Sequence, residues 1–157
     1  MIEQIYTYFT TEMIFMWLNL GVLSFWLVLI IFPQSQICRV FITSIFPIFI
    51  LSLAYGYLLY LFFNEGYDFI RNFELYLGLN AVSNLFADKA FIILFWTHFL
   101  TMNLFCGGWI VKDSQKFGIN KILMSFPLLI TYFIGPIGLF IYWLIRIFYA
   151  KRISLYD

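Results

Sequence analysis

Four long apolar runs constrain this chain more than any other feature of its sequence. A helix needs about 20 apolar residues to cross a bilayer. Four segments reach that length, residues 13–32, 40–63, 90–111 and 122–149. Backbone polar groups surrounded by lipid must be satisfied within their own segment, so the runs predict helices and not open strands. The sequence therefore predicts an all-α integral membrane protein, with residues 1–157 forming a single bundle of four transmembrane helices.

The composition agrees with a membrane protein and excludes several functional classes. The chain is 64% hydrophobic and 11% charged, whereas a soluble domain has about 25% charged residues. A net charge of +1 provides no basic surface for nucleic acid. One histidine and two cysteines, Cys38 and Cys106, form no cluster with metal-ligand spacing. We therefore expect no metal and no nucleic-acid partner, and we expect both thiols to be unpaired.

The first 13 residues contain no Lys or Arg, so the basic region of a signal peptide is absent. The Arg and Ser bias of a transit peptide is absent too. We expect an integral protein of a bacterial inner membrane, with an organelle membrane as the alternative.

The longest link, residues 64–89, has its own helical pattern. Phe69, Phe73 and Tyr76 recur at helical spacing, with charged residues between them. The pattern predicts an amphipathic helix lying at the membrane interface between the second and third spans. The alternative is an ordered loop that covers the bundle. Four spans would place both termini on one side of the membrane.

Polar residues interrupt the third apolar run, and polar groups at membrane depth often mark function. His98 is the side chain best suited to proton exchange near neutral pH, although it could instead bond a carbonyl of a neighbouring helix. Asn103 can donate and accept a hydrogen bond but cannot take up a proton. At about 100° per residue, Trp96, Asn103 and Asp113 share one helix face, while His98 and Trp109 lie on another. We therefore expect this helix to be central in the bundle.

The other spans contain further candidates. Gly135, Pro136 and Gly138 predict a kink in the fourth span that makes room for a bulky group, with simple packing as the alternative. Asn19 is a second amide at membrane depth, and we expect it to bond a neighbouring helix. We expect Arg146 to extend its charged end to the lipid headgroups.

Three segments together resemble the neoxanthin-synthase-like family, the family of the plant abscisic-acid-deficiency-four protein. They are LGLNAVSNLF, WTHFLTMNLFCGGWIVKD and PLLITYFIGPIGLFIYWLIR. The family's elements appear here in order as Leu85-Phe86, Trp96-Thr97-His98, Asn103-Leu104-Phe105, Gly107/Gly108-Trp109, Asp113 and Gly135-Pro136-Ile137-Gly138. The resemblance covers roughly residues 19–148.

The resemblance implies a four-span membrane protein related to the conversion of violaxanthin into neoxanthin in plants. That reaction is an isomerisation without net redox change, so the resemblance implies that no cofactor is required. It needs an acid at the epoxide oxygen and a base at the adjacent vinylic carbon. The implied catalytic residues are His98 and Asp113. The implied substrate-binding residues are Asn19, Trp96, Asn103, Trp109, Gly135, Pro136 and Gly138. Asn103 stands where the family typically has Asp, and an amide cannot serve as the base.

Two functional hypotheses follow. The first is an isomerase that acts on a carotenoid or another polyisoprenoid. The second is a non-catalytic protein that binds lipid or pigment, or that serves as an accessory subunit of a larger membrane complex. Membrane lipids, an isoprenoid ligand and an oligomeric or larger assembly are the expected partners.

Overall fold

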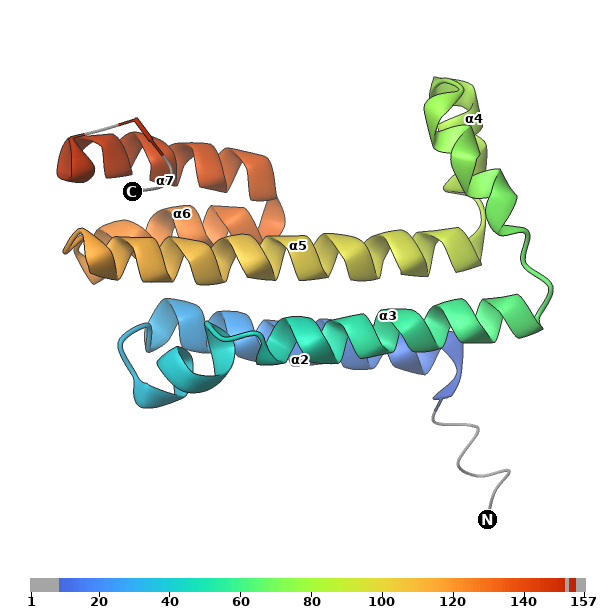
Figure 1. The fold of residues 1–157 in the computed structure, drawn as a ribbon, viewed down its shortest axis with the longest axis horizontal. Coiled ribbons are helices and arrows are strands. Elements are labelled where there is room, and N and C mark those ends of the chain that lie inside the picture. Colours follow the sequence, from blue (N-terminus) through green and yellow to red (C-terminus); the bar gives the residue numbers. More distant parts are fainter. Residues whose placement is uncertain (1–8, 152, 155–157) are drawn as a thin grey trace, which may run out of the picture. The chain divides into compact units, whose positions relative to one another are not determined.

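The structure, a computed structural model, describes residues 9–151, 153 and 154. These residues form helices and no strands, which confirms the all-α prediction (Figure 1). In chain order the elements are α2 (Thr11–Ile31), η2 (Cys38–Ile42), α3 (Phe46–Asn64), η3 (Phe69–Tyr76), α4 (Leu79–Leu85), α5 (Lys89–Lys116), α6 (Lys121–Phe133) and α7 (Gly135–Ala150).

Three of the described helices are long and apolar enough to cross a membrane. They are α2, α3 and α5, with 21, 19 and 28 residues. At 1.5 Å per residue they are roughly 28 to 42 Å long, and the hydrocarbon core of a bilayer is about 30 Å thick. Their positions agree with the first three predicted spans, although α3 begins at Phe46, after the short π-helix η2.

The fourth predicted span, residues 122–149, is not one kinked helix. It is divided into α6, of 13 residues, and α7, of 16 residues. Ile134 leaves the helical conformation, with φ −138° and ψ 76°, and Pro136 stands in the first turn of α7. Proline is favoured there because its missing N–H has no helical partner in the first turn. The chain reverses at this point, so α6 and α7 form an antiparallel hairpin (Figure 1).

The hairpin packs closely at its glycines and lies along the second half of α5. A methyl group on Gly138 would overlap Thr131 of α6, and one on Gly135 would overlap the Asn103 side chain of α5. Asn103 precedes the end of α5 at Lys116 by about 20 Å of helix, which is close to half of its length. Helices of 13 and 16 residues are shorter than the hydrocarbon core. The hairpin therefore fits a segment that enters the membrane and returns to the same side.

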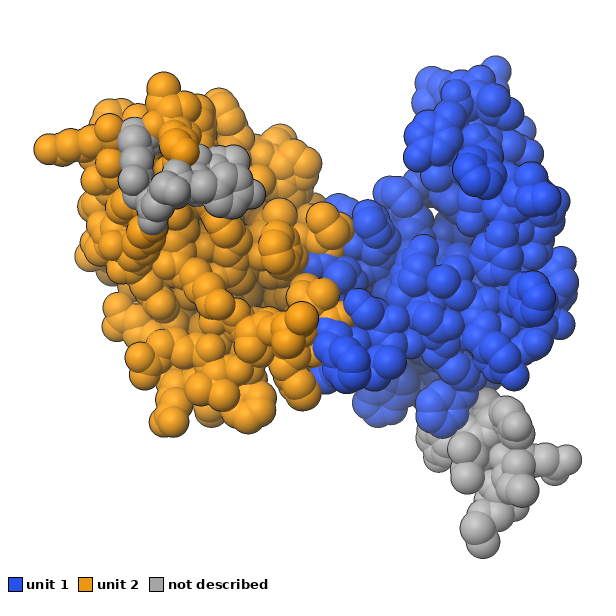
Figure 2. All heavy atoms as spheres, viewed as in Figure 1, with its two compact units in different colours: residues 1–20, 49–101 blue, residues 21–48, 102–157 orange. Residues whose placement is uncertain are grey.

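The chain separates into two compact units, shown in blue and orange in Figure 2. Unit 1 comprises residues 1–20 and 49–101, and unit 2 comprises residues 21–48 and 102–157. The core of unit 1 includes Leu58 and Leu85, which are fully buried. In unit 2, Trp26 packs against α5 at Gly107, where an added Cβ would lie 2.6 Å from Trp26 Cη2.

The link after α3 contains two short helical pieces, where the sequence predicted one amphipathic helix. The 3₁₀-helix η3 is capped by Asp68, whose carboxylate accepts from the Ile70 N–H at 2.9 Å. The seven-residue helix α4 follows. Tyr67 donates its hydroxyl hydrogen to Asn72 Oδ1 at 2.8 Å. Partial burial, with a further contribution from the Asp88 charge, raises the pKa of Tyr67. The location of this link at the membrane interface stays a prediction.

If α2, α3 and α5 each cross the membrane, and the α6–α7 hairpin returns to the side from which it entered, the chain crosses three times. This topology predicts that the C-terminus and the 64–88 link lie on opposite sides of the membrane. We would place single cysteines at Tyr76→Cys and after residue 157, in a Cys38→Ser/Cys106→Ser background. A membrane-impermeant maleimide should then label the two positions from opposite sides of oriented vesicles. Labelling of both from the same side would mean four crossings.

Gly138→Ala should destabilise the hairpin, by about 1–3 kcal/mol, because the methyl group meets the Thr131 backbone. The matched control is Gly21→Ala in α2, where nothing lies within 4 Å of an added Cβ. The control should be neutral or stabilising by up to about 1 kcal/mol, because alanine favours the helix. Thermal unfolding in detergent micelles measures both. Equal shifts for the two variants would contradict the close α6–α7 contact.

Candidate functional site: an aromatic cavity between α5 and α7

A cavity of about 650 Å³ lies in unit 2 between α5, α7 and the residues after α7. Its volume falls within the range of small-molecule sites. The lining residues are Phe105, Cys106, Trp109, Pro136, Leu139, Phe140, Trp143 and Ile153. Two of them, Trp109 and Pro136, were among the residues predicted from the sequence to bind substrate.

Helical spacing explains why aromatic rings collect here. Phe105 and Trp109 are four residues apart on α5, and Pro136, Phe140 and Trp143 recur at intervals of four and three on α7. Residues at these intervals share one helix face. The Trp109 ring also packs edge-to-face against Tyr142, with centroids 5.6 Å apart, a geometry that favours attraction between rings. The result is an apolar, aromatic wall suited to a flat hydrocarbon.

Asn103 supplies a polar group beside this apolar wall. The residue is 8% exposed, and its side chain lies against Gly135, the residue before the lining Pro136. Its Nδ2 has no hydrogen-bond partner among the described residues. A buried donor without an acceptor is costly, so an acceptor oxygen at this position would be favoured.

Asp113 lies at the other end of the hairpin, in a buried cluster. Arg146 Nε donates to Asp113 Oδ2 at 2.7 Å, and the Tyr142 hydroxyl donates to the same oxygen at 2.7 Å. The side chains of Arg146 and Asp113 are 1% and 8% exposed. Arg146 also donates to the Ser154 carbonyl at 2.8 Å and lies 4.9 Å from the centre of the Phe117 ring.

This cluster corrects the expectation for Arg146 and changes the interpretation of Asp113. Arg146 does not extend to the surface, because the Asp113 carboxylate compensates its charge inside unit 2. The carboxylate oxygen of Asp113 is already held by two donors. The arrangement favours a structural role in which Asp113 fixes α7 to α5, and its assignment as a catalytic residue stays a prediction.

The remaining predicted residues lie apart from the cavity lining. His98 is exposed on α5 in unit 1, and no hydrogen bond of its side chain is found in the described part of the chain. Trp96 Nε1 donates to Asn19 Oδ1 at 3.1 Å, and Asn19 Nδ2 donates to the Phe15 carbonyl at 2.7 Å. Asn19 and Trp96 thus hold α2 to α5 within unit 1, as expected for an amide between helices. Gly138 serves the packing of α6 on α7.

Sequence reasoning missed the aromatic face of α7 and the partner of Asp113. The spacing of Pro136, Phe140 and Trp143 indicates that they share one helix face. Because 24% of the chain is aromatic, a single aromatic helix face does not stand out in the sequence. Both cysteines are free, as expected. Burial raises the pKa of the Cys38 thiol, which lies in the link between α2 and α3.

A family model described as ABA DEFICIENT 4-like matches residues 13–142. The chain belongs to the ABA DEFICIENT 4-like family. This confirms the resemblance seen in the sequence. The match covers α5, with its wall of the cavity, and the first half of α7. No curated protein and no solved structure matches the chain.

Breaking the buried ion pair should strongly destabilise unit 2. Asp113→Asn or Arg146→Met should each cost about 3–5 kcal/mol, because each leaves one buried charge unpaired. The double variant Asp113→Asn/Arg146→Met removes both charges, so it should cost less than the sum of the single variants. Chemical unfolding in detergent micelles measures these differences, and additive losses would show that the pair is not coupled. His98→Ala is the control and should change stability by less than about 0.5 kcal/mol, because His98 is exposed.

Proposed function

We propose that this chain is a membrane protein that binds a carotenoid or another polyisoprenoid in the α5–α7 cavity. The observation that carries the proposal is the lining of that cavity, in which four aromatic rings face one apolar space. Rings and aliphatic side chains hold a conjugated hydrocarbon by burial and dispersion. Membership in the ABA DEFICIENT 4-like family supports this ligand class.

Binding is favoured over isomerisation by the distribution of titratable groups. An epoxide isomerase needs an acid and a base at the reacting carbons. Cys106 is the one titratable residue of the lining, and Asp113 is engaged by Arg146 and Tyr142. Asn103, at the position where relatives typically have Asp, cannot act as a base.

An isomerase is the second candidate, and the Asn103 donor is the observation that favours it. The Asn103 N–H is buried without a partner among the described residues and lies against Gly135, next to the lining, where it would suit an epoxide or hydroxyl oxygen that reached it. An accessory role in a larger membrane complex is supported by His98, which presents a polar ring on the exposed face of a membrane-length helix. A bacterial inner membrane is the proposed location.

Expression in hosts that accumulate violaxanthin, zeaxanthin or β-carotene tests the proposal. The purified chain should carry pigment in near-stoichiometric amount, measured by chromatography of the extracted protein. Cys106→Trp should lower bound pigment at least about fivefold, because the added indole fills the cavity. Leu129→Trp is the matched control, since Leu129 is an exposed residue of α6 outside the lining, and it should retain pigment.

The same experiment separates binding from catalysis. Unchanged violaxanthin on the protein supports binding, and a new allenic product that disappears when Cys106→Trp fills the cavity supports the isomerase. Asn103→Leu should reduce binding of the oxygenated pigments more than binding of β-carotene. Absence of both pigment and product in the wild-type chain would refute the proposed function.

A further inference from the structure

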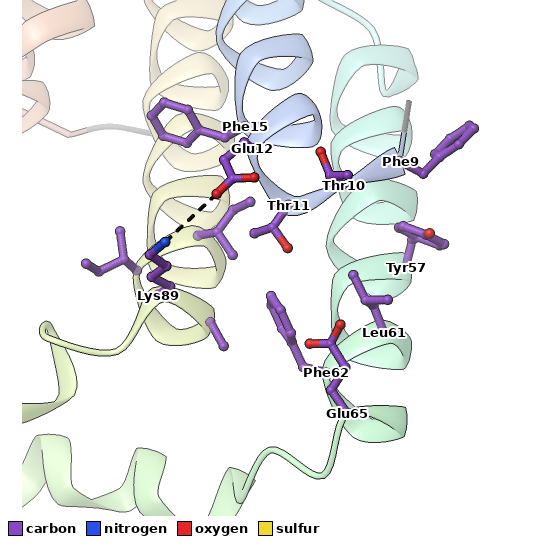
Figure 3. Close-up of a pocket in the computed structure, with 13 residues that line it drawn as sticks. Phe9, Thr10, Thr11, Glu12, Phe15, Tyr57, Leu61, Phe62, Glu65 and Lys89 are labelled. Atoms are coloured by element: carbon purple, nitrogen blue, oxygen red, sulfur yellow. Dashed lines mark ion pairs between the residues drawn. The ribbon is translucent and has the colours of Figure 1, made fainter. Parts of the chain in front are cut away.

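A second cavity lies in unit 1, where three helix ends meet. It has a volume of about 820 Å³ and is formed by the start of α2, the end of α3 and the start of α5 (Figure 3). Since α2 and α5 begin here and α3 ends here, all three ends belong to the same side of a membrane. The cavity is therefore at the boundary between lipid and water.

The lining of this cavity changes from polar to apolar along its walls. The polar groups include Glu12, Glu65 and Lys89, which come from the ends of the three helices (Figure 3). The apolar floor includes Phe15, Phe62 and Ile93. A site with a charged rim and an apolar floor matches an amphiphile, whose headgroup stays in the rim while its chains enter the floor.

Glu12, Glu65 and Lys89 form the charged rim of the cavity, and their charges are available to a ligand. Lys89 Nζ lies 3.9 Å from Glu12 Oε1, and their side chains are 90% and 83% exposed. An exposed pair of this kind contributes little stability, so a ligand can replace it at small cost. Glu65 has no ion pair among the described residues, and its side chain lies across the cavity from Lys89 (Figure 3).

The balance of these charges selects the headgroup. Two carboxylates and one ammonium give the rim a net negative charge, which disfavours purely anionic lipids. A headgroup with both charges is complementary, because its phosphate pairs with Lys89 while its ammonium pairs with Glu65 and Glu12. A primary ammonium also donates three hydrogen bonds to carboxylate oxygens, which a quaternary ammonium cannot do. We propose that this cavity binds a zwitterionic aminophospholipid of the phosphatidylethanolamine type.

Native mass spectrometry of the full chain in detergent micelles tests this site. Dioctanoyl phosphatidylethanolamine should bind about fivefold more tightly than dioctanoyl phosphatidylglycerol, and also more tightly than N-acetylated dioctanoyl phosphatidylethanolamine, which lacks the ammonium. A fivefold preference is what one or two exposed ion pairs can supply. Equal affinity for the three lipids would overturn the proposal.

Substitutions in the lining test whether the preference for phosphatidylethanolamine arises in this cavity. Glu65→Gln removes a carboxylate that has no ion partner in the described chain, so the fold should be unaffected and the preference should fall at least about twofold. Glu74→Gln is the matched control, because Glu74 is a carboxylate of the same unit outside the lining, and it should keep the full preference. A preference that survives in Glu65→Gln, or one that is lost equally in Glu74→Gln, would exclude this cavity as the site.

Ala90 also lines this cavity, and Ala90→Trp tests the space for the lipid chains without changing a charge. The indole should occupy the space that the lipid chains need, and it should weaken all binding of phosphatidylethanolamine. Pigment co-purification reports on the α5–α7 cavity and should be unaffected by Glu65→Gln, so failure of one proposal is distinguishable from failure of the other. Unchanged lipid affinity in Ala90→Trp would mean that the chains do not enter the cavity.

Discussion

The buried ion pair between Asp113 and Arg146 is the interaction on which the arrangement of unit 2 depends. A charge inside an apolar protein is tolerated only when it is paired and hydrogen-bonded. Arg146 is 1% exposed, so α7 must lie where its guanidinium reaches α5. At the opposite end of the hairpin, Gly135 packs directly on Asn103. These two contacts hold α7 along α5 at both ends, and the aromatic cavity is the space that remains between them.

The sequence predicts the helices well because run length and apolarity determine whether a segment can cross a membrane. It does not predict the division at Ile134, since a proline inside an apolar run is compatible with a kink as well as with a break. The outcome depends on tertiary partners. Gly138 permits close contact with Thr131, and this favours a hairpin over a straight helix. Neither partner is recognisable from local spacing alone.

Polarity at membrane depth identified residues that matter to the structure, but it could not tell which of them have a partner within the chain. Asn19 is paired with Trp96, and Asp113 is paired with Arg146. Asn103 differs, because its Nδ2 has no partner among the described residues. Helical spacing along α5 predicts which of its residues share a face. It does not predict which side chains of other helices pack against that face. The sequence therefore supplied candidates for the site, and the tertiary contacts distinguish the paired side chains from the unpaired Asn103 donor.

The contrast between Asn103 and the apolar lining determines what kind of selectivity the cavity can have. An apolar pocket discriminates weakly between ligands that differ by a methylene or a hydroxyl group. A buried donor discriminates strongly, because a ligand without an acceptor leaves that donor unpaired. In the proposed function, the rings of Phe105, Trp109 and Trp143 would hold many conjugated chains, and Asn103 would favour those whose end carries oxygen. An amide at position 103 cannot transfer a proton but can still donate a hydrogen bond, so the proposed ligand binding does not require catalysis.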